Sequence, residues 1–232
     1  MPTEVCKLPT CVDTPMVNTL IIFLAITLLA GLLFFEKNGN QKGKLTTKTI
    51  LSGLFIFTAL VQSHTIPGYF YILLIGLIFC LGGDVFLALS GKRMFLFGLV
   101  SFLLGHVFYA GCFFYLADLS HWTWIGAGIG IVAGGGVFFR LRSYLGPLLI
   151  PVIAYIVVIT VMLVGAWTVL CDGGVKFLGR LLGFSGAVSF YVSDLFVARD
   201  RFLKMEFKNR LFGLPLYYIG QFMLAFSVGA VS

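Results

Sequence analysis

The feature that most constrains this chain is a succession of apolar runs, each close to the twenty or so residues that an α-helix needs to cross a bilayer. Eight such runs occur, at about residues 17–35, 48–63, 68–90, 94–117, 121–139, 144–170, 175–198 and 211–231. Only 11% of the residues are charged, against about 25% in a typical globular protein. We therefore predict an all-α polytopic membrane protein. It is a bundle of eight transmembrane helices in a single domain, residues 1–232, with a short extracytoplasmic N-terminal tail of about residues 1–16.

The basic residues predict the orientation, because positively charged short loops stay on the cytoplasmic side of a membrane. The loops after the first, third, fifth and seventh spans hold 13 of the 16 Lys and Arg residues. These are Lys37, Lys42, Lys44 and Lys48; Lys92 and Arg93; Arg140 and Arg142; and Arg199, Arg201, Lys204, Lys208 and Arg210. Both termini are therefore predicted to be extracytoplasmic, in either a bacterial inner (cell) membrane or the endoplasmic reticulum membrane.

The net charge of +7 follows from the same basic loops. A positive collar at the cytoplasmic surface contacts anionic lipid headgroups, so nucleic-acid binding is not needed to explain it. The glycines of GAGIGIVAGGG, at 126, 130 and 134, predict a helix-packing face rather than a phosphate loop. A disulfide among Cys6, Cys11 and Cys171, all on the predicted outer side, is left open, as is the oligomeric state.

Two acids interrupt the apolar runs: Asp84 in CLGGDVFLAL and Asp194 in SFYVSDLFVARDRF. An acid deep in such a run costs roughly 2.5–3.5 kcal/mol even on the lenient insertion scale, so intramembrane acids indicate function. Counting back from Lys92 and Arg199 at 1.5 Å per residue puts them about 12 and 7 Å below the cytoplasmic boundary. The alternative is structural: Asp84 bonds to a helix backbone or a tyrosine, and Asp194 extends toward the basic residues of the seventh loop.

Further polar residues lie in the same half of the bundle. His106 in FLLGHVFYAG and Gln221 in LPLYYIGQFMLAFS lie roughly 20 and 16 Å from that boundary. Tyrosines stand three or four positions away on their helix faces. We expect His106 to face the same cavity as the aspartates. The candidate binding residues are His106, Tyr109, Tyr191, Tyr218 and Gln221.

Three segments carry a resemblance: FCLGGDVFLALSGKRMFLFGLVSFLLGHVFYA, SFYVSDLFVARDRF and LPLYYIGQFMLAFSV. In this order they resemble the signature segments of the YhhN-like lysoplasmalogenase family, eight-span membrane hydrolases. They occupy the third, fourth, seventh and eighth spans, about half of the chain. The resemblance implies an enzyme that cleaves the vinyl-ether bond of lysoplasmalogens to a fatty aldehyde and glycerophosphocholine or glycerophosphoethanolamine. Its partners would be the lysophospholipid substrate and membrane lipids.

The chemistry of this bond fits a pair of carboxyls. A vinyl ether hydrolyses when an acid protonates its β-carbon and water captures the oxocarbenium ion, and glycosidases manage a similar ion with two carboxyls. A low dielectric and a neighbouring like charge both favour the neutral carboxyl, so one aspartate can stay protonated while the other is ionised. On depth we assign Asp84 as the acid and Asp194 as the base, with the reverse open. No metal and no cofactor are predicted.

Two other classes remain open at this stage. An intramembrane aspartyl protease also uses two aspartates, one of them in a G-x-G-D motif, but here Leu81 stands at the place of the first glycine. A proton-coupled transporter could use the acids as a relay, although the sequence has no evident internal repeat. Release of aldehyde from a vinyl-ether lysolipid separates all three classes.

Overall fold

A computed structural model describes residues 14–231 as a bundle of long helices without a strand in that range. The helices are α1 Thr14–Lys37, α2 Gln41–Val61, α3 Pro67–Ala88, α4 Lys92–Leu116, α5 His121–Leu141, α6 Leu149–Cys171, α7 Phe177–Ala198 and α8 Phe207–Ala230. All eight are long and apolar enough to cross a membrane. The all-α, eight-span prediction is confirmed. Cys6, Cys11 and nearly all of the predicted N-terminal tail lie outside the described residues.

The second helix begins earlier than predicted. Asn40 caps it by accepting a hydrogen bond from the backbone N–H of Gly43 at 3.0 Å, a role that asparagine fills well. Gly39 makes the preceding turn with a positive φ of +66°. Lys42, Lys44 and Lys48 therefore lie on α2, and their assignment to the first loop is wrong. The error arose because a charge ended the apolar run, although the helix continues through it.

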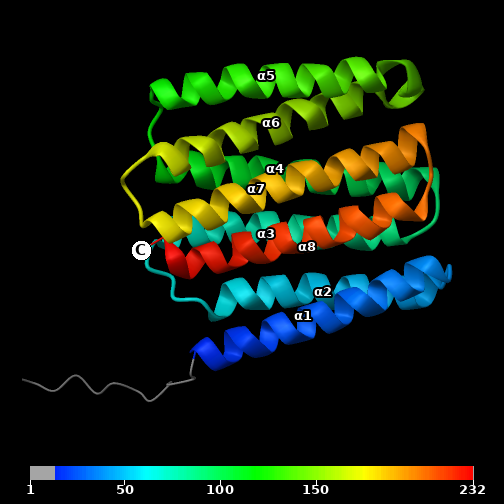
Figure 1. The fold of residues 1–232 in the computed structure, drawn as a ribbon, viewed down its shortest axis with the longest axis horizontal. Coiled ribbons are helices and arrows are strands. Elements are labelled where there is room, and N and C mark those ends of the chain that lie inside the picture. Colours follow the sequence, from blue (N-terminus) through cyan, green and yellow to red (C-terminus); the bar gives the residue numbers. More distant parts are fainter. Residues whose placement is uncertain (1–13, 232) are drawn as a thin grey trace, which may run out of the picture.

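The helices are arranged as in Figure 1, with α3, α4, α7 and α8 in the middle of the bundle. One edge is formed by α1 and α2, and the other by α5, which packs on α6. The predicted glycine face on α5 is confirmed: a Cβ at Gly126 would meet Trp167, and a Cβ at Gly130 would meet Thr160. Small residues allow helices to approach closely where no water is present to drive association.

Two central helix pairs also rely on glycine. A Cβ at Gly76 of α3 would lie 3.1 Å from the carbonyl oxygen of Gly105 on α4. On α8, a Cβ at Gly220 would lie 2.8 Å from the carbonyl oxygen of Gly186 on α7. No side chain fits between these backbones. The two pairs that carry the aspartates are therefore held at close, fixed separations.

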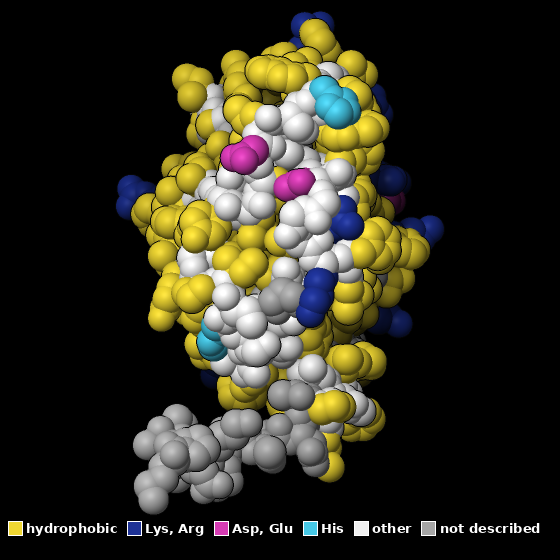
Figure 2. All heavy atoms as spheres, turned by 90° about the vertical axis from the view of Figure 1, so that its left-hand side faces the viewer, with side chains coloured by type: hydrophobic (Ala, Val, Ile, Leu, Met, Phe, Trp, Pro, Cys, Tyr) yellow, Lys and Arg dark blue, Asp and Glu magenta, His cyan; other side chains and the backbone are white. Residues whose placement is uncertain are grey.

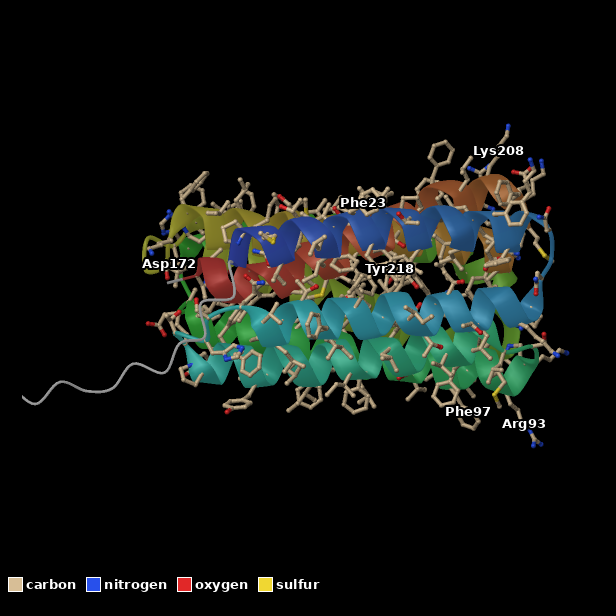
Figure 3. All side chains as sticks on the ribbon, turned by 90° about the horizontal axis from the view of Figure 1, so that it is seen from below. Phe23, Arg93, Phe97, Asp172, Lys208 and Tyr218 are labelled. Atoms are coloured by element: carbon tan, nitrogen blue, oxygen red, sulfur yellow. The ribbon has the colours of Figure 1, made fainter. Side chains whose placement is uncertain are left out.

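The sides of the bundle are apolar and its ends are polar. Phe23 and Phe97 are 72% and 51% exposed and point outward from the bundle. Figure 3 places Arg93 and Lys208 at one end and Asp172 at the other. Figure 2 faces the end that holds the α2–α3, α4–α5 and α6–α7 loops, and shows a polar strip flanked by hydrophobic side chains. The chain is an integral multi-pass membrane protein.

Candidate active site

A cavity of about 320 Å³ opens between the helices at the end that holds the basic loops. Residues from every helix from α1 to α8 contribute to its lining. Asp84 and Asp194 both line it, together with Tyr155, Tyr191 and Tyr217. The fold therefore brings the two intramembrane acids, 110 positions apart in the sequence, to one cavity.

Asp84 lies in a dense set of donors. Its side chain is 1% exposed. Ser52 of α2 donates to its carboxylate at 2.6 Å, and Tyr217 of α8 donates at 2.5 Å. The ammonium group of Lys48 lies 3.3 Å away. A cation and two hydroxyls directed at one carboxylate stabilise its ionised form.

Lys48 is one of the residues around the two aspartates that sequence reasoning missed. It is 7% exposed, one helical turn before Ser52, so the two side chains share a face of α2. Asp84 has no basic residue near it along its own helix, and that absence hid the partner on another helix. The signal available in the sequence was the spacing of Lys48 and Ser52, a cation and a hydroxyl four positions apart at the start of an apolar run.

Asp194 has simpler surroundings. Tyr155 of α6 donates a hydrogen bond to its carboxyl at 2.5 Å. Within residues 14–231 Asp194 forms no ion pair. Arg199 contacts Glu206 at 3.7 Å instead. The alternative in which Asp194 extends toward the basic residues of the seventh loop is therefore not realised.

Gln221 and Tyr109 lie behind the cavity rather than in its lining. The hydroxyl of Tyr109 donates to the Gln221 side-chain oxygen at 2.7 Å, and the Gln221 amide donates to the Tyr217 hydroxyl at 3.3 Å. Tyr217 in turn donates to Asp84. The two predicted binding residues thus form a buried hydrogen-bond chain that orients the Tyr217 hydroxyl toward Asp84. They support the site without lining the cavity.

His106 does not line the cavity, contrary to expectation. It is fully buried, and its ring lies edge-on to Phe190 at 4.4 Å and to Tyr155 at 5.3 Å between centroids. Phe102, one turn earlier on α4, lines the cavity in its place. Neither ring nitrogen has a hydrogen-bond partner within the described part of the chain, and the same holds for the hydroxyl of Tyr218.

Tyr191 is the predicted binding residue that does line the cavity, where it is partly exposed. Residues 14–231 contain no group of three or more His, Cys, Asp or Glu side chains placed to hold a metal ion. The cavity thus offers two carboxyls with different neighbours, several phenols and an apolar wall. Such a set can transfer a proton and stabilise a nearby positive charge.

The fold and the site define an integral membrane protein with paired aspartates in a cavity that opens at its basic end. The YhhN family model matches residues 43–228, a range that includes Lys48, both aspartates and Gln221. The chain belongs to the YhhN family.

Two curated proteins are similar to this chain in sequence. Human lysoplasmalogenase TMEM86A is 30% identical over 159 residues, which cover 66% of this chain and 63% of the relative. The bovine protein of the same name is 28% identical with the same coverage. The chain therefore spans less than two thirds of the length of these relatives. No solved structure matches the chain significantly.

Proposed function

We propose that this protein is a lysoplasmalogenase. It hydrolyses the vinyl-ether bond of lysoplasmenylcholine or lysoplasmenylethanolamine, and it releases a fatty aldehyde and glycerophosphocholine or glycerophosphoethanolamine. The observation that carries the proposal is the cavity shared by Asp84 and Asp194 within an apolar bundle. Family membership and the names of the human and bovine relatives support the substrate class.

The reaction consumes one water molecule and needs one acid and one base. The acid gives its proton to the β-carbon of the vinyl ether, so the double bond becomes single and an oxocarbenium ion forms. Water attacks the carbon that is bonded to the ether oxygen and passes a proton to the base. The resulting hemiacetal gives its hydroxyl proton to the carboxylate that acted as the acid, while its bond to the glycerol oxygen breaks. That oxygen takes the proton held by the base, so aldehyde and alcohol leave and both carboxyls return to their starting states.

The contacts of the two aspartates favour one order of roles. Asp84, with a cation and two hydroxyl donors, is suited to remain ionised, to stabilise the oxocarbenium ion and to accept the proton of water. Asp194, with the single neutral donor Tyr155, is suited to carry the proton. This reverses the order assigned from depth alone, and it is the alternative that the sequence left open.

The lining of the cavity fits a lysolipid. Val137 and Leu141 of α5, with Val152 and Ile156 of α6, provide an apolar wall for the hydrocarbon chain. Charged side chains gather at the basic end, where a headgroup would lie. Tyr191 also lines the cavity and is placed to contact the substrate.

The protein is proposed to lie with its basic end in the cytoplasm and both termini outside, in a bacterial inner membrane or the endoplasmic reticulum membrane. In a variant without native cysteines, a cysteine at Asn40 should be shielded from an impermeant thiol reagent added to intact cells. A cysteine at Asp118 should be labelled. The opposite pattern would put the cavity mouth on the outer side.

The activity is tested with purified protein and both headgroup forms of the substrate, with aldehyde release as the readout. Carbon protonation predicts that in deuterated water the aldehyde carries one solvent deuteron on the carbon next to its carbonyl group, which was the β-carbon of the vinyl ether. Absence of aldehyde with either substrate would refute the function. Aldehyde without deuterium at that carbon, measured before exchange, would refute the mechanism while leaving the activity.

A further inference from the structure

Arg201 lies at the cavity lining on an unusual piece of backbone. Residues Arg199–Leu203 form a π-helical turn between α7 and α8. Such turns are rare in proteins, and those that do occur are often found at functional sites. The guanidinium of Arg201 lies over the ring of Phe95, 4.2 Å from its centroid, and both side chains line the cavity.

The other cations of the cavity already have anionic partners. Lys48 pairs with Asp84 at 3.3 Å, and Arg210 pairs with Glu36 at 2.9 Å. Lys44 also contacts Glu36, at 3.9 Å. Arg201, by contrast, has no carboxylate within ion-pair distance in residues 14–231.

An arginine held in this way suits an anionic oxygen ligand. The ring of Phe95 supports one face of the guanidinium by a cation–π contact and limits its rotation. The N–H donors at the edge of the plane stay available. Their fixed fork matches the oxygens of a phosphate, which a lysine ammonium meets only as a point charge.

From these observations we infer that Arg201 binds the phosphodiester of the lysolipid headgroup and so fixes the depth at which the vinyl ether stops. This inference rests on the proposed function. Arg201 follows Asp194 by seven residues, about 10 Å along a helix. The vinyl-ether oxygen and the phosphorus of a lysolipid are five bonds apart, roughly 6 Å when extended. With hydrogen-bond contacts of about 3 Å at each end the lysolipid reaches about 12 Å, which is enough to cover this rise.

The inference predicts that the cavity binds lipids that carry a phosphate more tightly than lipids that lack one. A lysophospholipid is anchored at both ends of its polar portion, whereas an alkenyl glycerol without phosphate is held only by its chain and glycerol. Arg201 is a binding residue in this scheme and takes no part in proton transfer.

The test measures binding, so it does not depend on turnover. A saturated-ether lysophospholipid lacks the double bond that must be protonated, and its dissociation constant can be measured by calorimetry in non-ionic detergent. Arg201→Gln should weaken its binding roughly 10- to 100-fold, the usual loss for a bond to a charged group. Binding of the matching alkyl glycerol, which has no phosphate, should not change. Arg201→Lys should fall between Arg201→Gln and the unmodified protein, because it keeps the charge and loses the fork.

Arg142 provides the matched control. It also lies over a phenylalanine, Phe139, at 5.2 Å, and is exposed like Arg201, but it lies outside the cavity lining. Arg142→Gln should leave both dissociation constants unchanged.

Several results would overturn the inference. These are equal weakening of both ligands by Arg201→Gln, no weakening of either, or no measurable binding of the phospholipid analogue to the unmodified protein. A loss seen only in vesicles that contain anionic lipid would assign Arg201 to the bilayer instead. If aldehyde release fails while this binding pattern holds, the proposed reaction is wrong and the phosphate site stands.

Discussion

Asp84 and Asp194 share a cavity, yet their surroundings differ in kind. Asp84 receives a cation and two hydroxyls from α2 and α8, whereas Asp194 receives one hydroxyl from α6. The difference in depth from which Asp84 was assigned as the acid takes no account of these contacts. The contacts from other helices favour a charged Asp84 and a neutral Asp194, and this difference is the basis of the roles that we propose.

The largest expected effect comes from removing the proton of the proposed acid. Asp194→Asn keeps the size of the side chain and should lower kcat for aldehyde release by about 10²- to 10⁴-fold, the usual range for general acid catalysis. Asp84→Asn should also reduce the rate, because its carboxylate stabilises the cation and accepts the proton of water. Asp118→Asn, exposed near the opposite end, is the control and should change little. Near-normal rates in both cavity variants would refute the two-aspartate mechanism.

The second effect concerns the buried ion pair. Lys48→Met leaves the carboxylate of Asp84 without its cation, and breaking such a pair costs about 3–5 kcal/mol of unfolding free energy. The double variant Lys48→Met with Asp84→Asn should recover part of this stability but not the activity. Unfolding in detergent micelles, followed by loss of helical signal, measures both.

Lys44→Met is the matched control on the same helix. Lys44 is 19% exposed and lies 3.9 Å from Glu36, which keeps Arg210 as a partner at 2.9 Å. The loss should be within about 1 kcal/mol, as for a partly exposed pair. Equal losses from the two lysine variants would mean that Asp84 is neutral in the folded protein.

The smallest effect tests the charge states of the two aspartates through the tyrosines that donate hydrogen bonds to them. Tyr217→Phe removes a hydrogen bond to a charged carboxylate and should cost about 1.5–3 kcal/mol of unfolding free energy. Tyr155→Phe removes a bond to a neutral carboxyl and should cost about 0.5–1.5 kcal/mol. A larger loss for Tyr155→Phe would restore the order assigned from depth, with Asp84 as the acid.

The sequence was sufficient to predict the helices and to single out two acids that line one cavity. Apolar runs of the length of a bilayer predict spans almost without further information, and an acid within such a run is conspicuous for the same energetic reason. The start of α2 was misplaced because hydropathy treats Lys48 as a boundary, whereas the fold pairs it with Asp84 inside the bundle. A charge next to an apolar run can belong to the helix when its partner lies elsewhere.

The residues around the acids were less predictable. Tyr155 lies in an apolar run with no polar neighbour on its face, so nothing in the sequence marked it as the donor to Asp194. His106 was marked by its chemistry, but its direction depends on how α4 packs against Phe190 of α7. Side-chain direction in a bundle is set by crossing helices, and one sequence does not specify those crossings.

The contact between Gly220 and Gly186 has a mechanical consequence. The two backbones act as a spacer of fixed width between α8, which carries Tyr217, and α7, which carries Asp194. A single methyl group at Gly220 would lie 2.8 Å from the Gly186 carbonyl oxygen, too close for van der Waals contact, so the two helices would have to move apart. The spacing between Tyr217, which contacts Asp84, and Asp194 therefore depends on a pair of glycines outside the cavity lining.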